Sequence, residues 1–192
     1  MLSYDFATVR HCYTCCRGYQ LKRIFQIFFY SLVGSFLLAG YARADNRQLL
    51  GTYRDWDAFM LIKGSGEKVC YMISIPKSSS PRTLKHGNPF LTVSHKPARK
   101  IKNEVNFVVG YNFRKNSRVT MKVDKKRTFR LFTEGDGAWG DDVKADNAMT
   151  SAMKRGSSLV MSAQSKRGNN TRYRFSLSGF TAAHNAITKA CR

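Results

Sequence analysis

The sequence predicts a mainly β protein, an antiparallel sandwich or barrel with two short α-helices, preceded by a signal peptide. Three observations predict this architecture. Apolar and polar residues alternate along several short segments, as they do in half-buried strands. Two further segments carry apolar residues at helical spacing instead. A short apolar stretch near the start has the marks of an export signal.

The export signal comprises a basic pair at 22–23, an apolar run at 24–39 and an A-x-A site at 42–44. This order is typical of a secretory signal. An uncleaved membrane anchor is the alternative, although the run is shorter than the roughly 20 residues that span a bilayer. We therefore expect cleavage after Ala44, which leaves 45–192 as a single mature domain.

Residues 1–44 hold three of the five cysteines, Cys12, Cys15 and Cys16. Two of these are adjacent, which is poor spacing for metal ligands. The segment ahead of the export signal fits that signal awkwardly. An alternative start of translation at Leu21 would remove it.

Two cysteines remain in the mature part, Cys70 and Cys191. In an oxidising compartment a lone pair of cysteines predicts a disulfide, and two buried free thiols are the alternative. A bridge that closes so long a loop is worth about 4–5 kcal/mol on the chain-entropy model.

The charge balance is strongly basic. The chain has 33 Lys and Arg against 12 Asp and Glu, a net charge of +21. Removal of five bases and one acid with residues 1–44 leaves 28 and 11, a net charge of +17. Such a field attracts polyanions. For an exported protein these are lipopolysaccharide, anionic phospholipid, acidic glycans and extracellular nucleic acid, and chromosomal DNA is not expected.

Period-two alternation is clearest where Val119, Met121 and Val123 are separated by polar residues. Gly-, Pro- or polar-rich connections separate the apolar segments, and 77–88 is predicted to be a long loop. The predicted strands lie at 56–62, 68–75, 89–94, 105–111, 118–124, 128–132, 158–163 and 172–177. Eight strands at this spacing favour an antiparallel sandwich or barrel.

Asp141–Arg155 predicts the first helix, with acids at its start, bases at its end and Gly156 after it. Its apolar face is expected to contain Ala148, Met149, Ala152 and Met153. Thr181–Ala190 predicts the second helix, whose apolar stripe directs Cys191 toward the body of the domain.

The candidate functional residues are basic side chains. By alternation Arg118, Lys122, Arg172 and Arg174 point away from the core, so their strands would form a cationic face if they share a sheet. Scattered, solvated cations are the alternative. The predicted polyanion-binding residues are Lys96, Arg99, Lys100, Lys102, Arg114, Lys115, Arg118, Lys122, Lys125, Lys126, Arg127, Arg172 and Arg174.

Other chemistry finds little support in the sequence. The motif G-x-G-x-x-G at 135–140 lacks the βαβ context of a dinucleotide site, so a loop is expected and no cofactor. Five carboxylates between 134 and 146 fit no EF-hand, and helix-start electrostatics with nearby bases explains them without a metal. The histidines form no catalytic constellation, and His86, His95 and His184 are expected at the surface. We therefore expect no enzyme.

The mature chain resembles the invasion-associated locus B family of alphaproteobacteria, from about Asp55 to Cys191. The resemblance is carried, in order, by Asp55-Trp56-Asp57-Ala58-Phe59, Val69-Cys70-Tyr71, Ile75-Pro76, Gly110-Tyr111, Phe113, Phe129-Arg130-Leu131-Phe132, Ala138-Trp139, Ala152-Met153-Lys154-Arg155-Gly156, Ser176-Leu177-Ser178-Gly179-Phe180 and Ala190-Cys191. It implies an exported envelope protein with an immunoglobulin-like β-sandwich and a link to host-cell invasion, and it supplies no catalytic motif.

Together these observations predict a periplasmic, outer-membrane-associated or secreted protein that acts by binding, without a stable transmembrane span after signal cleavage. Its expected partners are anionic envelope or host-surface polymers. An envelope-stabilising or chaperone-like periplasmic protein is one alternative. An enzyme acting on glycans or the cell wall is another, and it would require two carboxylates that converge in a cleft.

Overall fold

The computed structural model describes residues 44–192, so the export signal and Cys12, Cys15 and Cys16 lie outside the described residues. The described chain forms strands joined by short connections, a 3-10 turn and two helices. In chain order they are β1 (Asn46–Tyr53), β2 (Trp56–Ile62), β3 (Lys68–Ser74), β4 (Ser78–Ser80), β5 (Phe90–Lys96), η2 (Pro97–Arg99), β6 (Ile101–Val108), β7 (Arg118–Val123), β8 (Arg127–Glu134), β9 (Gly137–Trp139), α2 (Val143–Arg155), β10 (Ser158–Gln164), β11 (Asn170–Ser176) and α3 (Phe180–Ala190).

All the strands belong to one antiparallel sheet in the order β1-β2-β3-β5-β6-β9-β8-β7-β10-β11-β4. Strands β1 and β4 are its two edges. The mainly β antiparallel architecture with two short helices is therefore confirmed. Both layers of the sandwich are formed by halves of this one continuous sheet.

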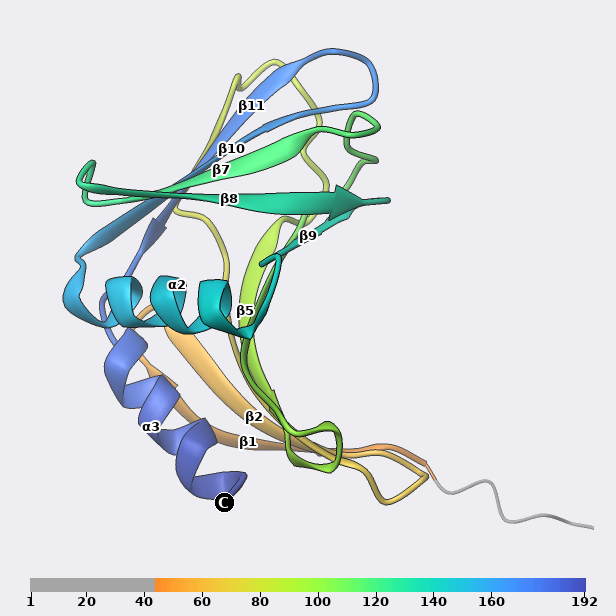
Figure 1. Ribbon diagram of the computed structural model, residues 1–192, viewed down its shortest axis with the longest axis vertical. Coiled ribbons are helices and arrows are strands. Elements are labelled where there is room, and N and C mark those ends of the chain that lie inside the picture. The colour runs from red at the N-terminus through yellow and green to blue at the C-terminus, as the bar shows by residue number, and fades with distance from the viewer. Residues whose placement is uncertain (1–43) are drawn as a thin grey trace, which may run out of the picture. The chain divides into compact units, whose positions relative to one another are not determined.

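The sheet bends so that the half containing β6 faces the half containing β11 (Figure 1). Aromatic rings meet across this interface. The Phe107 ring of β6 lies 5.4 Å from the Tyr173 ring and 6.1 Å from the Phe175 ring of β11, centroid to centroid. Alternation along each strand sends one set of side chains into this core and the other set to the outer surface.

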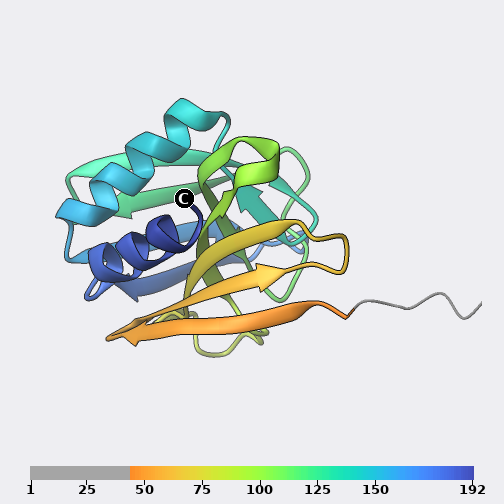
Figure 2. The same cartoon turned by 90° about the horizontal axis from the view of Figure 1, so that it is seen from below.

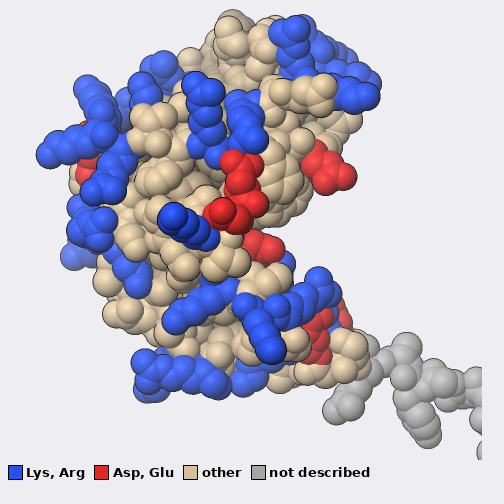
Figure 3. Space-filling view, in the orientation of Figure 1, with Lys and Arg blue, Asp and Glu red and all other residues tan. Residues whose placement is uncertain are grey.

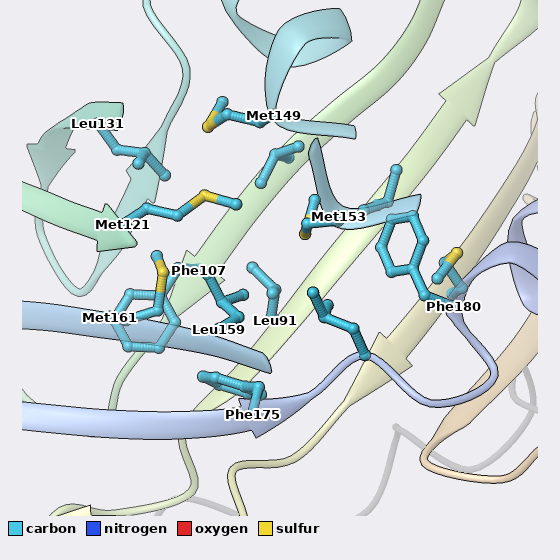
Figure 4. Packing of buried hydrophobic residues seen from close by; sticks show 14 of the residues in the cluster. Leu91, Phe107, Met121, Leu131, Met149, Met153, Leu159, Met161, Phe175 and Phe180 are labelled. Carbon is cyan, nitrogen blue, oxygen red and sulfur yellow. The ribbon is translucent and has the colours of Figure 1, made fainter. Parts of the chain in front are cut away.

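The helices occupy the open end between the two halves of the sheet, side by side in Figure 2. Helix α2 packs on β6 and β8, and α3 packs on β1, β2, β3 and β5. In Figure 4, Met149 and Met153 of α2 and Phe180 of α3 meet Leu91, Met121 and Leu159 from the strands. One apolar core therefore joins both halves of the sheet to both helices.

All eight predicted strands are present, with boundaries shifted by a few residues. Three strands were not predicted. Strand β1 lacks a period-two pattern, because Leu49 and Leu50 are adjacent and the register shifts between Leu49 and Gly51. Strands β4 and β9 have three residues each and lie within segments that were expected to be loops.

Helix α2 begins two residues later than predicted, at Val143, because the Asp142 carboxylate caps it and accepts the Ala145 N–H at 2.6 Å. Gly156 follows the last turn, as predicted. Its buried face differs from the prediction, since Ala148 is exposed. Asp146 and Thr150 are buried beside the two methionines instead. The predicted buried face of α2 was therefore displaced around the helix, because the prediction counted only apolar residues and left out the buried polar ones.

The prediction that the histidines lie at the surface was wrong for two of them. His95 is 4% exposed and His184 is 3% exposed, and their rings pack edge to face 5.3 Å apart. Each ring has partners for both nitrogens, which explains why burial is tolerated. His86 is half-buried, and its Nε2 donates to the Pro81 carbonyl at 2.8 Å.

The predicted disulfide is confirmed: Cys70 of β3 and Cys191, at the end of α3, are bonded. The bond ties the last helix to the sheet across 121 residues of sequence. Within residues 44–192, no helix has the length and apolar character that a membrane crossing requires.

Candidate anion-binding surface

The candidate site is the outer face of β7, β10 and β11. Strand β10 lies between the other two and pairs with both. On β7, Arg118 and Lys122 are exposed while their neighbours are buried. On β11, Arg172 and Arg174 are exposed in the same way. The predicted orientation of these four side chains is therefore confirmed, and the condition that their strands share a sheet is met.

Strand register arranges these cations in rows across the sheet. Lys122 and Arg174 both pair with Val160 of β10, from opposite sides. Thr120 and Arg172 flank Ser162 in the same way, two residues along. Because paired residues share a face and strands lie about 4.8 Å apart, each row spans about 10 Å.

Strand β8 extends this face. Arg130 pairs with Thr120 and adds a cation to its row. Phe132 pairs with Arg118, and the Phe132 ring stacks on that of Trp139, 5.8 Å away. The face thus combines five cations with an aromatic pair, the exposed Phe132 and the half-buried Trp139. We call it the basic face, and its cations are Arg118, Lys122, Arg130, Arg172 and Arg174.

Counter-charges on the basic face are scarce. The Arg118 guanidinium contacts both carboxylate oxygens of Asp141, at 2.9 and 2.8 Å. Among the residues that the structure describes, no ion pair involves the other four cations of this face. Their field is therefore directed at solvent rather than neutralised within the fold.

A shallow depression of about 590 Å³ lies at one end of the basic face. Arg118 and Arg172 stand on its sides, and Ser162 and Gln164 lie between them. The small or polar side chains of β10 leave room for a ligand between the longer cationic side chains of β7 and those of β11.

Asp124 holds the other end of this face together. Its carboxylate accepts the backbone N–H of Ser157 at 3.0 Å and that of Ser158 at 2.8 Å, and these bonds are the main cause that lowers its pKa. The turn after β7 is thereby fixed to the start of β10, which stabilises the register on which the rows depend.

The basic residues at 96–102 lie elsewhere, on the hairpin between β5 and β6. Two of them are neutralised there: Lys96 forms an ion pair with Glu104, and the Arg99 Nε lies 3.0 Å from a carboxylate oxygen of Glu67. Lys100 and Lys102 are exposed on the same hairpin. This cluster is therefore separate from the basic face.

The remaining predicted cations lie around the basic face rather than on it. Arg114 and Lys115 belong to the connection before β7, and the Arg114 guanidinium donates to the Gln164 side chain at 3.0 Å. The turn between β7 and β8 carries Lys125 and Lys126. Arg127 pairs with the core residue Val123, so it does not share the outer face.

The carboxylates between 134 and 146 have separate structural roles. Asp142 caps α2, and Asp141 pairs with Arg118, as helix-start electrostatics predicted. Asp146 is 8% exposed and accepts the Val105 N–H at 3.2 Å, and burial raises its pKa to about 6. Within the described part of the chain, no group of three or more His, Cys, Asp or Glu residues is placed to hold a metal ion.

Charge is spread unevenly over the surface in Figure 3. Lys and Arg cover much of the visible face, including the top over the turn between β10 and β11, and Asp and Glu are confined to a few spots. Sequence reasoning missed the cations that gather at this end. Lys85 is separated from Lys166 and Arg167 by eighty residues of sequence, and nothing in their local patterns indicates that they line one cavity.

Comparison with known proteins gives a family. The family model described as "Invasion associated locus B (IalB) protein" matches residues 56–188. That range covers β2 through most of α3, and hence the whole basic face. Neither the curated proteins nor the solved structures gave a match to this chain. Because the family model spans more than half of the sequence, the chain belongs to the invasion associated locus B family.

Proposed function

We propose that this protein is exported and acts without catalysis, by binding anionic polymers of the bacterial envelope or a host surface on its basic face. The observation that carries this proposal is the register of β7, β10 and β11. It places Lys122 and Arg174 in one row, on either side of β10, and Arg172 in the next row. Regular rows of cations suit a ligand whose negative charges also repeat.

Electrostatics supports a polymer over a single small anion. An isolated exposed ion pair contributes about 0–1 kcal/mol, so one contact gives little affinity. Several cations that engage one chain release several counterions together, and the affinity then depends steeply on salt. The net charge of +17 on residues 45–192 adds long-range attraction.

Retention on immobilised heparin tests the proposal. The double variant Arg172→Glu/Arg174→Glu should elute at clearly lower salt than the wild type, because it reverses two cations of the basic face. The dependence of log K on log salt should fall by roughly two, about one counterion for each lost cation. Binding to lipopolysaccharide should weaken in parallel.

The matched control is Lys100→Glu/Lys102→Glu on the β5–β6 hairpin, which changes the net charge equally at exposed positions. It should lose much less retention than the basic-face variant. Equal losses would mean that net charge alone drives binding, and unchanged retention of the Arg172/Arg174 variant would contradict the proposal outright.

The site of action needs a separate experiment. Protease added to intact cells should degrade the protein if it contacts host surfaces, and should spare it if it remains in the periplasm. Protection would favour the envelope-stabilising role, in which the basic face binds lipopolysaccharide or anionic lipid from inside. The family description, with its reference to invasion, supports the surface-exposed arrangement.

A further inference from the structure

A cavity of about 460 Å³ lies at the end of the domain, beside the turn between β10 and β11. Three segments that are distant in sequence line it: 83–86 ahead of β5, 111–112 after β6, and 165–169 with Thr171. The volume is in the range of small-molecule sites, about 300–1,000 Å³. We propose that this cavity binds a carboxylate-bearing sugar at the end of an anionic glycan.

The walls of the cavity are rich in hydroxyl and amide groups. Asn112, Ser165, Asn169 and Thr171 supply both donors and acceptors. Tyr111 contributes an aromatic ring as well as its hydroxyl group. A sugar ring presents the matching combination of hydroxyl groups on its edge and an apolar face.

The charge at the cavity is entirely positive. Lys85, Lys166 and Arg167 are exposed at its lining, and none of the described lining residues is acidic. Two of these cations come from one turn and the third from a separate loop, so they approach a ligand from different sides. A neutral sugar gains nothing from this charge, whereas a carboxylate pairs with it.

A chain of hydrogen bonds fixes the inner wall. The Tyr111 hydroxyl lies 2.5 Å from the Thr171 hydroxyl and 3.1 Å from that of Tyr173. The Tyr173 hydroxyl in turn lies 2.9 Å from His86 Nδ1, and burial raises the pKa of Tyr173. The polar groups that face the ligand are therefore held in place before it arrives.

The backbone of the three segments is also tied together. The Gly110 N–H donates to the His86 carbonyl at 3.1 Å, and the Lys166 N–H donates to that of Asn112 at 2.8 Å. At Gly87, which has a φ of +65°, an added Cβ would lie 2.5 Å from the Gly110 Cα. This close backbone contact requires glycine and keeps the loop that carries Lys85 in position.

The cavity adjoins the basic face. Its lining residue Ser165 directly follows Gln164, and its lining residue Thr171 directly precedes Arg172. Gln164 and Arg172 both line the depression on the outer surface. A polymer that lies along β10 would reach the cavity at the tip of the β10–β11 hairpin. The identification of the sugar as the end of such a polymer rests on the proposed function, but the cavity can be tested by itself.

The test is titration of the full mature domain with D-glucuronate, glucose and inorganic phosphate in turn. Calorimetry or ligand-observed NMR measures the binding. D-glucuronate should bind, and glucose should bind at least tenfold more weakly because it lacks the carboxylate. Inorganic phosphate should also bind more weakly, because it cannot use the hydroxyl-lined wall. Glucuronate binding no stronger than that of phosphate or glucose would overturn the assignment.

Variants place the binding in the cavity. Arg167→Gln and Lys85→Gln change exposed side chains and should each weaken glucuronate binding at least threefold while the fold is kept. Arg172→Glu/Arg174→Glu should lose heparin retention but keep most glucuronate binding. Intact glucuronate binding in both cavity variants would refute the cavity. If the Arg172/Arg174 variant loses only heparin binding, the cavity assignment is supported. If that variant keeps its heparin retention, only the proposed function is refuted.

Discussion

His95 and His184 form a buried pair in which each ring nitrogen has a hydrogen-bond partner. His95 Nδ1 accepts the Asn103 N–H at 3.1 Å, and its Nε2 lies 3.1 Å from the Thr188 hydroxyl. His184 Nε2 donates to the Asn103 side-chain oxygen at 2.7 Å. Burial, with Lys154 and Lys102 nearby, lowers the pKa of His184 to about 4, and burial lowers that of His95 as well.

The low pKa of His184 predicts a loss of stability in acid. Its pKa in the unfolded chain is about 6.5, so the neutral residue contributes stability above that pH, and this is lost as pH falls from 6.5 toward 4. Between pH 7 and pH 5 the wild type should lose on the order of 1 kcal/mol more free energy of unfolding than His184→Gln. Urea unfolding at both pH values measures the difference.

The variant His184→Gln is a suitable comparison because glutamine does not titrate and every other acid-sensitive residue is still present. Asp146 acts in the opposite sense, since its raised pKa favours the folded state as pH falls. Its effect is common to both proteins and cancels in the comparison. Equal changes with pH in the two proteins would contradict the assignment of the buried imidazole.

At the scale of elements, α2 depends on its N-terminal cap. The Asp142 side chain is exposed and accepts the Ala145 N–H, and its charge lies at the positive end of the helix dipole. Asp142→Ala should lower the free energy of unfolding by about 1 kcal/mol. Thermal or urea unfolding checks this value.

Asp142→Asn is the matched control, because asparagine caps a helix nearly as well as aspartate. It should keep most of the stability that the alanine variant loses. If both variants lost the same amount, the charge rather than the cap would be the main contribution. An unaffected alanine variant would show that packing of Met149 and Met153 alone holds α2 in place.

At the scale of the whole molecule, the Cys70–Cys191 bond closes residues 70–191, most of the described chain, into one loop. Reduction should destabilise the domain by about 2–5 kcal/mol, because the unfolded chain regains the freedom that the cross-link removes. Helix α3 should be released first, since the bond lies at its end. Thermal unfolding with and without reductant measures the change.

Alkylation provides the control for that experiment. The native mature protein should offer no reactive thiol until it is reduced, and then two. The double variant Cys70→Ser/Cys191→Ser should behave like the reduced protein and be insensitive to reductant. An unchanged unfolding midpoint after complete reduction would mean that the core alone determines stability.

The sequence by itself determined eight of the eleven strands and both helices of the described chain. Alternation at Val119, Met121 and Val123 reports which side chains are buried, and that property is local. The same local signal gave the outward direction of Arg172 and Arg174. The pair Cys70 and Cys191 was available from counting alone, because no other cysteine lies after residue 44.

Only the tertiary structure decided which of these elements meet. Strand order put β10 between β7 and β11, and this turned separate exposed cations into rows. Folding brought Lys85 and Arg167 to the lining of one cavity, and it buried His184, whose partner Asn103 lies far away in sequence. Local patterns record the burial of each residue, but contacts between distant segments depend on how the sheet bends and pairs, which no short window of sequence encodes.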